Sequence, residues 1–484
     1  MKRITLALVV LVGVAGTTHA TLVLPDGSGD YPTIQAAIDA TPYGATILLG
    51  DGVFTGPGNR DLQIEYTLLA SQSGDPEACI LDAGGFDLGA ATDGLWCTGI
   101  GIRNAGPVTN TLHPGPFRFE NCVIEGGHGL VVSNWAALTD CVVRGNSGAL
   151  VISAASCSAT GCLFESNFSP IASAYYPTLE NCTFTNNQPP SGYSLVGVAV
   201  NEADYGSGSF TNCRFAGNDA VSLVHFSRGT EYHVVTGCEF AFNPGSCLWF
   251  ESGFSGQPIA TISGCTFVAN GAEGGADIVQ EESQGGVSVE RCIFSLRQGG
   301  DVVQPALGDY ELTFTDCDLY GNVGGDWVGV LADQYGVGCN MSENPQFCDW
   351  AGGDFSLYDT SPCLPANNTC AVQMGAEGQG CEGVTAVDDT PSPAALLTAH
   401  PNPFNPKTRL SFSLPAAADV RLAVYALDGR RVATVLDGQR LAAGPHALDW
   451  EARDASGRAL ASGVYLLALE AGGHRESMKL TLLR

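Results

Sequence analysis

Four ionisable side chains lie close together in the sequence and offer acid–base chemistry: His225, Arg228, Glu231 and His233. Histidine and glutamate act as general acids and bases near neutral pH, and a neighbouring arginine would stabilise an anion. Gly229 predicts a turn between the two histidines, and side chains beside such turns more often serve structure or face solvent. These four are therefore candidate catalytic residues, with a structural role as the alternative.

A second group of residues suits a sugar ligand, because aromatic rings stack on sugar rings and carboxylates accept hydrogen bonds from hydroxyl groups. Cysteine recurs at loose intervals along the chain, and the longest of these intervals runs from Cys182 to Cys213. It predicts an enlarged loop that could form one side of a binding site. The residues predicted to bind carbohydrate at or beside this loop are Tyr175, Tyr176, Tyr193, Glu202, Asp204 and Tyr205. A solvated loop without a ligand is the alternative.

The elements that position these residues are copies of a short unit marked by cysteine. The unit recurs at Cys122, Cys141, Cys162, Cys182, Cys213, Cys238, Cys265, Cys292 and Cys317. Two residues after each cysteine stands an apolar residue, and alternate residues of a strand face the same side, so both side chains point into a core. The residue before the cysteine is Asn, Asp or Gly in all copies but one, which predicts a bend with left-handed backbone angles. An Asn five residues after most of the cysteines predicts a second turn, where its amide bonds to the backbone or stacks on the next coil.

A unit that recurs at this loose but persistent interval is typical of a solenoid. Helical periodicity is nearly absent and Gly-rich turns are frequent, so we predict an all-β, right-handed parallel β-helix. Cysteines of neighbouring coils would lie about 4.8 Å apart, beyond the Cβ separation of about 3.8 Å that a disulfide prefers. We therefore expect most of these cysteines to be reduced and buried, with a metal or redox site as the weaker alternative.

The acidic charge of the chain excludes several partners. The formal net charge is −29 and the isoelectric point is about 4.4, and residues 21–390 contain no lysine. We expect such a surface to repel nucleic acids and anionic lipids, and no apolar run after the first residues is long enough to span a membrane. It would also repel polyuronates unless calcium bridges the carboxylates, so calcium is the one cofactor left open. The cations that remain in this region are Arg60, Arg103, Arg118, Arg144, Arg214, Arg228, Arg291 and Arg297.

The first residues are typical of export. Residues 1–20 combine a basic start, an apolar run and a small-residue site at Ala20, which predicts a secretory signal peptide. We therefore predict a secreted or cell-surface protein.

Residues 21–383 form the predicted β-helix, and its first segment carries a resemblance to a known family. Thr33 predicts the start of a helix with Ile34, Ala37 and Ile38 on one face. The run Asp-Gly-Ser-Gly-Asp-Tyr-Pro-Thr-Ile-Gln-Ala-Ala-Ile at residues 26–38 resembles the start of pectin methylesterases and the N-terminal cap of the pectate-lyase-like superfamily. The resemblance implies a helix that plugs the open end of a pectin-lyase-like solenoid. The esterase motifs Gln-Ala-Val-Ala, Asp-Phe-Ile-Phe-Gly and Gly-Arg-Pro-Trp are missing, so the resemblance implies the fold and not the activity.

Residues 338–383 carry cysteines outside the regular spacing: Cys339, Cys348, Cys363, Cys370 and Cys381. This stretch resembles the closing coil of many exported bacterial β-helix proteins. Irregular, clustered cysteines in an exported protein indicate disulfides. We predict two bridges among the last four of these cysteines, with the pairing left open. Zinc is the weaker alternative, because no histidine and no paired C-x-x-C accompany them, and we predict no metal site.

The last part of the chain predicts a separate domain. Residues 384–395 are a linker by composition, and residues 396–484 contain short alternating strands typical of a β-sandwich. Pro-Asn-Pro-Phe-Asn-Pro at 401–406, Ala-Ser-Gly-Val-Tyr at 461–465 and Lys479 resemble the C-terminal sorting domain of type IX secretion cargo and the Ig-like domain of flagellar hook-capping proteins. The resemblance implies an Ig-like fold and the outer-membrane secretion machinery as a partner.

Two function classes remain open from the sequence. One is an exported β-helix with a carbohydrate-binding, adhesive or structural role. The other is a carbohydrate-active enzyme on the same scaffold, a polysaccharide lyase or a pectin-esterase-like enzyme. Arginines and carboxylates that converge in an aromatic-lined groove would favour the enzyme, whereas a groove of Ser, Thr, Asn and Gly would favour the binding role.

Overall fold

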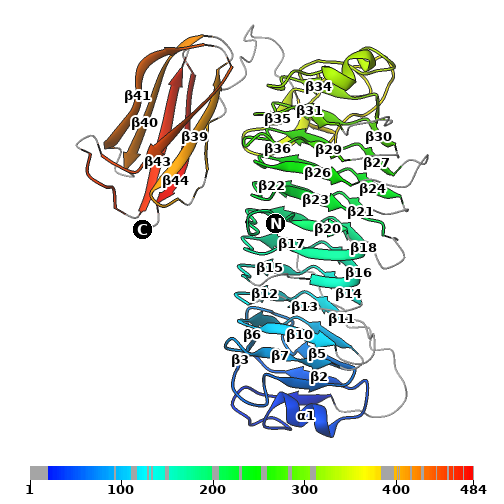
Figure 1. Cartoon of the computed structure of the whole chain (residues 1–484). Coiled ribbons are helices and arrows are strands. Elements are labelled where there is room, and N and C mark those ends of the chain that lie inside the picture. Colours follow the sequence, from blue (N-terminus) through cyan, green and yellow to red (C-terminus); the bar gives the residue numbers. More distant parts are fainter. Residues whose placement is uncertain are drawn as a thin grey trace. The chain divides into compact units, whose positions relative to one another are not determined.

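The computed structural model describes residues 20–91, 94–110, 117–127, 130–131, 135–147, 152–198, 206–227, 232–251, 259–281, 286–305, 312–382, 397–400, 402, 404–414, 417–426, 430–442, 444–454, 457–461, 463–471 and 474–482. The predicted signal peptide, except for Ala20, and the predicted linker lie outside these residues. The fold is an all-β parallel solenoid of about 12 turns with a further β-sheet region at the C-terminal end, in agreement with the predicted fold class (Figure 1). Two compact units, residues 1–209 and 210–484, are described separately below.

A short helix begins the first unit. Helix α1 (Ile34–Ala40) starts after Thr33, whose side-chain oxygen accepts a hydrogen bond from the backbone N of Ala36 at 3.2 Å. Ile34 and Ala37 are fully buried, so the predicted helix and its apolar face are confirmed. The helix packs against the first strands of the solenoid.

The strands of the solenoid lie in two long parallel sheets, which we call sheet 1 and sheet 2. In the first unit, sheet 1 contains β1 (Thr21–Val23), β2 (Thr46–Leu49), β5 (Thr67–Ser71), β8 (Leu95–Thr98), β11 (Phe117–Glu120), β13 (Leu130–Val131), β14 (Trp135–Thr139), β16 (Ile152–Thr160), β18 (Ala172–Glu180) and β20 (Val196–Val198). Sheet 2 contains β3 (Gly52–Phe54), β6 (Cys79–Asp82), β9 (Gly101–Arg103), β12 (Val123–Glu125), β15 (Val142–Arg144), β17 (Leu163–Glu165) and β19 (Thr183–Thr185). A small third sheet contains β4 (Leu62–Ile64), β7 (Asp87–Ala91) and β10 (Gly106–Asn110).

The bend predicted before each cysteine is confirmed. The preceding residue has a positive φ at all nine positions, from 49° at Asn121 to 66° at Gly161. The nine cysteines are buried and carry free thiols, as predicted, and their thiols point at backbone oxygens. The Sγ of Cys141, for example, donates to the carbonyl oxygen of Phe119 at 3.3 Å. These cysteines therefore serve as small core residues.

The asparagines that follow the cysteines form hydrogen-bonded ladders, as predicted. In the first unit, Nδ2 of Asn146 donates to Oδ1 of Asn167, and Nδ2 of Asn167 donates to Oδ1 of Asn187, both at 2.9 Å. In the second unit, Nδ2 of Asn243 donates to Oδ1 of Asn270 at 3.0 Å. Each of these bonds joins two buried amides of neighbouring coils, which ties successive turns together.

The second unit continues the same repeat. Its strands in sheet 1 are β21 (Ser209–Thr211), β23 (Ser222–Phe226), β24 (His233–Thr236), β26 (Ser246–Phe250), β27 (Ala260–Ser263), β29 (Ile278–Gln280), β30 (Val287–Glu290), β32 (Val303–Gln304) and β33 (Leu312–Thr315). Its strands in sheet 2 are β22 (Arg214–Ala216), β25 (Glu239–Ala241), β28 (Thr266–Val268), β31 (Ile293–Ser295) and β34 (Asp318–Tyr320). The 3-10 helix η1 (Gly329–Gln334) follows the last of these strands.

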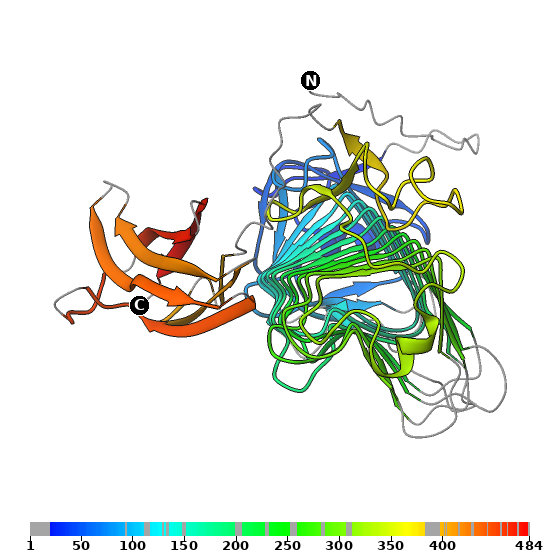
Figure 2. The same cartoon turned by 90° about the horizontal axis from the view of Figure 1, so that it is seen from above.

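The cysteine-rich stretch folds back over the outer face of sheet 2 within the second unit. It contains β35 (Phe347–Asp349), β36 (Asp354–Tyr358) and β37 (Gln379–Cys381), and we call residues 339–382 the closing segment (yellow in Figure 2). Phe355, Leu364 and Met374 of this segment share a buried apolar cluster with Val268 and Ile293 of sheet 2. The closing segment is therefore a cover for this face.

Two disulfides are present in the closing segment, which confirms the predicted number but corrects one residue. The bridges are Cys339–Cys370 and Cys348–Cys381, whereas Cys363, which we predicted to be bridged, is a free and buried thiol. Its Sγ donates to Oδ2 of Asp318 at 3.3 Å. Cys363 therefore faces sheet 2 and not another cysteine, a difference that the spacing of cysteines in the sequence does not reveal.

The C-terminal residues form two antiparallel sheets around one core. One sheet contains β38 (Thr398–His400), β39 (Lys407–Leu414) and β42 (Gly444–Glu451). The other contains β41 (Arg431–Leu441), β40 (Ala418–Ala426), β43 (Gly463–Ala471) and β44 (His474–Leu482). Both sheets contribute to the same buried cluster, for example Phe412 from the first and Leu422 from the second. No helix in the described part of the chain is long and apolar enough to cross a membrane.

Candidate functional site

The two histidines of the predicted catalytic group face different surroundings. His233 is buried inside the coil, where its ring lies 4.5 Å from that of Phe226, and burial lowers its pKa to about 4. His225 lies on the outer face of β23 and is partly exposed. Arg228 and Glu231 lie outside the described residues. The predicted group of four is therefore not assembled by the residues that the structure describes.

His225 instead lies beside an acid that the sequence analysis did not name. Its Nε2 lies 3.1 Å from Oε1 of Glu251, and its ring lies 6.0 Å from the ring of Trp249. His225 and Trp249 are direct partners on β23 and β26, and Glu251 comes two residues after Trp249 on the same face. Only the pairing of these two strands brings the acid to the histidine, so no spacing along the chain could have indicated it.

The predicted carbohydrate-binding residues are spread over two places. Tyr175 and Tyr176 lie on β18, and Tyr193 lies in a turn, where its ring is exposed and its backbone N donates to the carbonyl oxygen of Pro190 at 3.1 Å. Of these, Tyr176 shares the outer face of sheet 1 with the residues described next. Glu202, Asp204 and Tyr205 lie outside the described residues.

Two exposed tryptophans flank an arginine on the outer face of sheet 1 in the first unit. The Cζ atom of Arg118 lies 5.4 Å from the ring centroid of Trp96 and 5.4 Å from that of Trp135. Both tryptophans are 37% exposed, although burial is favoured for rings of this size. The sequence analysis missed them, because an isolated tryptophan in a strand does not show which face it occupies.

The local strand pattern explains the outward direction of these side chains. In β8, Leu95 and Cys97 are buried, so Trp96 between them points outward. In β11, Phe117 and Phe119 are buried and Arg118 is exposed. The core residues therefore fix the faces of both strands.

The tryptophans belong to a longer row that crosses five neighbouring strands. β8 pairs with β11, β11 with β14, β14 with β16, and β16 with β18. One outward residue of each strand forms the row, and we call Trp96, Arg118, Trp135, Ser156 and Tyr176 the aromatic row. Aromatic and polar side chains alternate along it.

Arg118 is available to a ligand, unlike Arg103 and Arg144 of the first unit. No ion pair of Arg118 is formed within the described residues, whereas Arg103 and Arg144 each contact two glutamates. The rings on both sides hold the guanidinium group by cation–π attraction, and no carboxylate of the described residues pairs with its N–H groups. The aromatic row therefore offers stacking surfaces together with hydrogen-bond donors.

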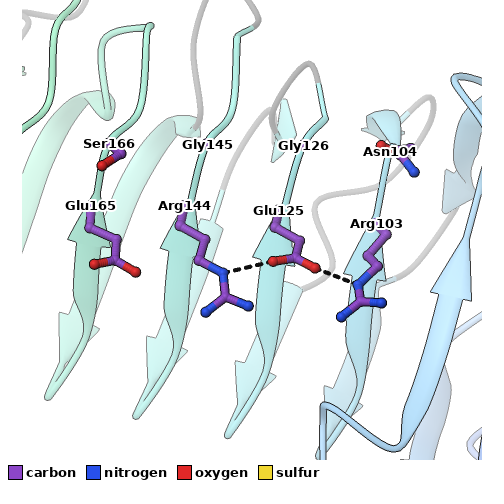
Figure 3. A pocket seen from close by; sticks show the side chains of 8 residues that line it. All are labelled: Arg103, Asn104, Glu125, Gly126, Arg144, Gly145, Glu165 and Ser166. Carbon is purple, nitrogen blue, oxygen red and sulfur yellow. Dashed lines mark hydrogen bonds and ion pairs between the residues drawn. The ribbon is translucent and has the colours of Figure 1, made fainter. Parts of the chain in front are cut away.

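A second cluster lies on the outer face of sheet 2 in the first unit, and we call Glu77, Arg103, Glu125, Arg144 and Glu165 the charged ladder. Figure 3 shows Arg103, Glu125, Arg144 and Glu165 projecting to the same side from β9, β12, β15 and β17. Nε of Arg144 donates to Oε2 of Glu125 at 2.7 Å, and Arg103 contacts the other oxygen of the same carboxylate. Glu77 lies 3.1 Å from Arg103 and 3.0 Å from Arg144. An open hollow of about 600 Å³ lies over the ladder.

The electrostatics of the charged ladder do not suit proton abstraction. The pKa of Glu125 is lowered: partial burial opposes the shift, but the hydrogen bond from Arg144 and the charges of Arg144 and Arg103 outweigh it. The pKa of Arg144 is raised, chiefly by its hydrogen bond to Glu125. A general base works best with a pKa near the working pH, and a lowered carboxylate pKa moves away from it. The hollow also has no aromatic lining, so it matches neither of the grooves expected from the sequence.

One cluster of metal-type ligands occurs in the described part of the chain, formed by Asp316, Cys339 and Cys370. The two sulfur atoms are joined in a disulfide, so they cannot act as thiolate ligands. This cluster therefore does not contradict the predicted absence of a metal site.

Comparisons with known proteins concern mainly the fold. Residues 128–295 match the family model "Right handed beta helix region". Among solved structures, the chain is similar to full-length tailspike protein 2 from the Escherichia coli O157:H7 bacteriophage CAB120, with 11% identity over 96% of this chain and 68% of that chain and a TM-score of 0.23. No curated protein sequence matches the chain. The solenoid is thus a right-handed parallel β-helix, as predicted.

Proposed function

We propose that this chain is an exported glycan-binding β-helix protein and that it binds carbohydrate on the aromatic row without cleaving it. The observation that carries the proposal is the arrangement of Trp96, Arg118 and Trp135 on the outer face of sheet 1. Sugar rings present apolar C–H faces that pack on aromatic rings, and their hydroxyl groups accept hydrogen bonds from a guanidinium group.

The cost of leaving the tryptophans exposed supports a ligand. Each ring would gain free energy on burial, yet both lie on a rigid strand, pointing away from the core. Because the strands are fixed by hydrogen bonds on both sides, little conformational entropy is lost when a ligand stacks on them. Exposed, pre-positioned aromatic side chains are the usual means by which a protein gains binding energy from a neutral, hydroxylated partner.

Export is part of the proposal. The two disulfides of the closing segment suit an oxidising compartment, because cytosolic thiols are kept reduced. Together with the signal-peptide pattern at residues 1–20, the disulfides support a location outside the cell or on its surface. The C-terminal sandwich would then act as the sorting domain, in line with its resemblance to type IX secretion cargo, with the secretion machinery as its partner.

Retention of the purified chain on immobilised polysaccharides, followed by measurement of the Kd, tests the binding function. We expect Trp96→Ala and Trp135→Ala each to weaken binding about tenfold, since one stacked ring contributes about 1–1.5 kcal/mol. Phe168→Ala is the matched control: it removes an exposed aromatic ring that lies outside the five strands of the aromatic row and should leave binding unchanged. No retention on any neutral or acidic polysaccharide would contradict the proposal.

One observation favours a second candidate, a polysaccharide lyase or carbohydrate esterase. The contact between His225 and Glu251 beside Trp249 is an arrangement in which an imidazole could accept a proton near a stacked sugar. Release of unsaturated uronate or methanol by the purified chain, with calcium and with a chelator, tests it. Turnover that is lost in His225→Gln would establish this enzyme class and overturn the non-cleaving part of the proposal.

A further inference from the structure

We propose that the aromatic row binds a linear, extended glycan whose rings repeat with a period of two sugars, and that the glycan runs across the strands from β8 to β18. This inference rests on the proposed function and specifies its ligand. It is drawn from the alternation of aromatic and polar side chains over successive strands.

The spacing of the strands sets the repeat of the ligand. Neighbouring strands of a sheet lie about 4.8 Å apart, so outward side chains two strands apart are separated by roughly 9.6 Å. Trp135 and Tyr176 are two strands apart and are joined in register through Ser156. Trp96 and Trp135 are also two strands apart but are offset by two residues along the strands. Because both ring centroids lie 5.4 Å from Cζ of Arg118, these two rings are at most about 11 Å apart. In an extended chain of the cellulose type, alternate rings are turned by half a turn, so every second ring presents the same face at a similar interval. Such a chain would place a ring on each aromatic side chain of the row.

The polar members of the row lie where the intervening sugars would be. Arg118 lies between the first two rings, at the same distance from both, and Ser156 lies between the second and the third. The row shifts along the strand direction by two residues between Arg118 and Trp135, because Arg118 pairs with Ala137 and not with Trp135. The long arginine side chain bridges this shift. Its guanidinium N–H groups can thus donate to the hydroxyl groups of the sugar that is not stacked.

The length of the row predicts how affinity depends on chain length. The five strands span about 19 Å, which accommodates five sugars at one sugar per strand. A single sugar stacks on one aromatic side chain, and a trisaccharide is the shortest chain that reaches two of them. A pentasaccharide is the shortest chain that reaches all three aromatic side chains. We therefore expect two steps in affinity, at the third and at the fifth sugar, with little gain from the second or the fourth.

Isothermal titration of the full-length chain with cello-oligosaccharides of one to six sugars tests the inference. Each step should increase the affinity about tenfold, as expected for one additional stacked ring. Tyr176→Ala should remove the step at the fifth sugar and keep the step at the third. Trp135→Ala should remove the step at the third. Malto-oligosaccharides of the same lengths are the control ligand, because their curved chains do not present every second ring to a flat row, and they should show no steps.

The outcomes separate this inference from the function on which it rests. A protein that binds a polysaccharide through Trp96 and Trp135, but whose affinity rises smoothly with the number of sugars or steps equally with malto-oligosaccharides, would overturn the two-sugar period and leave glycan binding intact. Binding of the monosaccharide as tightly as the hexasaccharide would do the same. Failure to bind any polysaccharide would overturn both proposals.

Discussion

The outer face of sheet 2 differs between the two units, although the repeat that builds it is the same. In the first unit, the middle residue of β15 and β17 is buried and both flanking residues are partly exposed. In the second unit, every residue of β28 and β31 is buried. The difference comes from the closing segment, whose Phe355 and Met374 share a buried cluster with Ile293 of β31.

The inner face, by contrast, is alike in both units. Phe164 stacks on Phe184 at 4.7 Å in the first unit, and Phe267 stacks on Phe294 at 4.5 Å in the second. The core constrains inward residues in every coil, because neighbouring coils must fill the same space. Outward residues are constrained only by the parts of the protein that pack against them. The outward positions are therefore the ones that can vary from coil to coil, either to form a binding surface or to contact the closing segment.

The largest effect is expected from a charge placed on the covered face. Ile293 in β31 and Val142 in β15 hold the same place in the repeat, but Ile293 is 1% exposed and Val142 is partly exposed. Ile293→Glu should destabilise the closing segment by about 4–5 kcal/mol, because it buries a carboxylate without a partner. Val142→Glu is the matched control and should cost less than about 1 kcal/mol. Hydrogen exchange of the peptides around each substituted residue measures the two losses of stability. Equal losses would contradict the difference between the covered and the uncovered face.

The next effect is a pH dependence of the covered face. Burial raises the pKa of Asp318 to about 7, despite hydrogen bonds from the backbone N of Glu343 and the thiol of Cys363. A raised folded-state pKa means that stability is full below the ordinary pKa of about 4 and is lost as the pH rises through about 7. The loss should be roughly 3–4 kcal/mol. Asp318→Asn should abolish the slope of local stability between pH 4 and pH 7, and an unchanged slope in this variant would contradict the assignment.

A smaller effect is expected from opening a disulfide of the cover. Cys339→Ser combined with Cys370→Ser removes a cross-link between residues 31 positions apart and should cost about 3 kcal/mol. Limited proteolysis of the closing segment measures the loss. The charged ladder of the first unit is the internal reference, and its protection should stay the same. Faster cleavage in both regions would indicate that the two faces are not independent.

The smallest effect concerns the outer face of sheet 2 in the first unit, where the charged ladder lies. The pKa of Glu125 is lowered even though partial burial opposes the shift, because its contacts with Arg144 and Arg103 outweigh it. The stability that ionised Glu125 contributes is therefore present above the ordinary pKa of about 4.3 and is lost as the pH falls through the lower folded-state pKa. This pH dependence is opposite in sign to that of Asp318. Glu125→Gln should reduce local stability by about 1 kcal/mol at neutral pH, as exposed ion pairs contribute little. Local hydrogen exchange at pH 7 and at pH 3 checks both the size and the sign.

Much of the fold could be predicted from the residues. The small residues before each cysteine predicted a bend, and the asparagines after it predicted a ladder, because both depend on local backbone geometry and on the identical neighbour in the next coil. The helix after Thr33 followed from a local capping signal. The functional residues were harder to predict. Of the predicted sugar-binding residues in the described part of the chain, Tyr176 joins the aromatic row, but its partners Trp96 and Trp135 come from strands far away in the sequence.

The sequence by itself determined the repeat, the inward core and the parallel stacking, because each follows from spacing within one coil and from copies of that coil. Only the tertiary structure decided which outward residues meet. The register between strands brought Arg118 between two tryptophans and Glu251 beside His225, and the return of the closing segment buried one face and left Cys363 without a disulfide. Contacts between coils depend on loop lengths and strand register, which vary from coil to coil, so no spacing within a single coil encodes them.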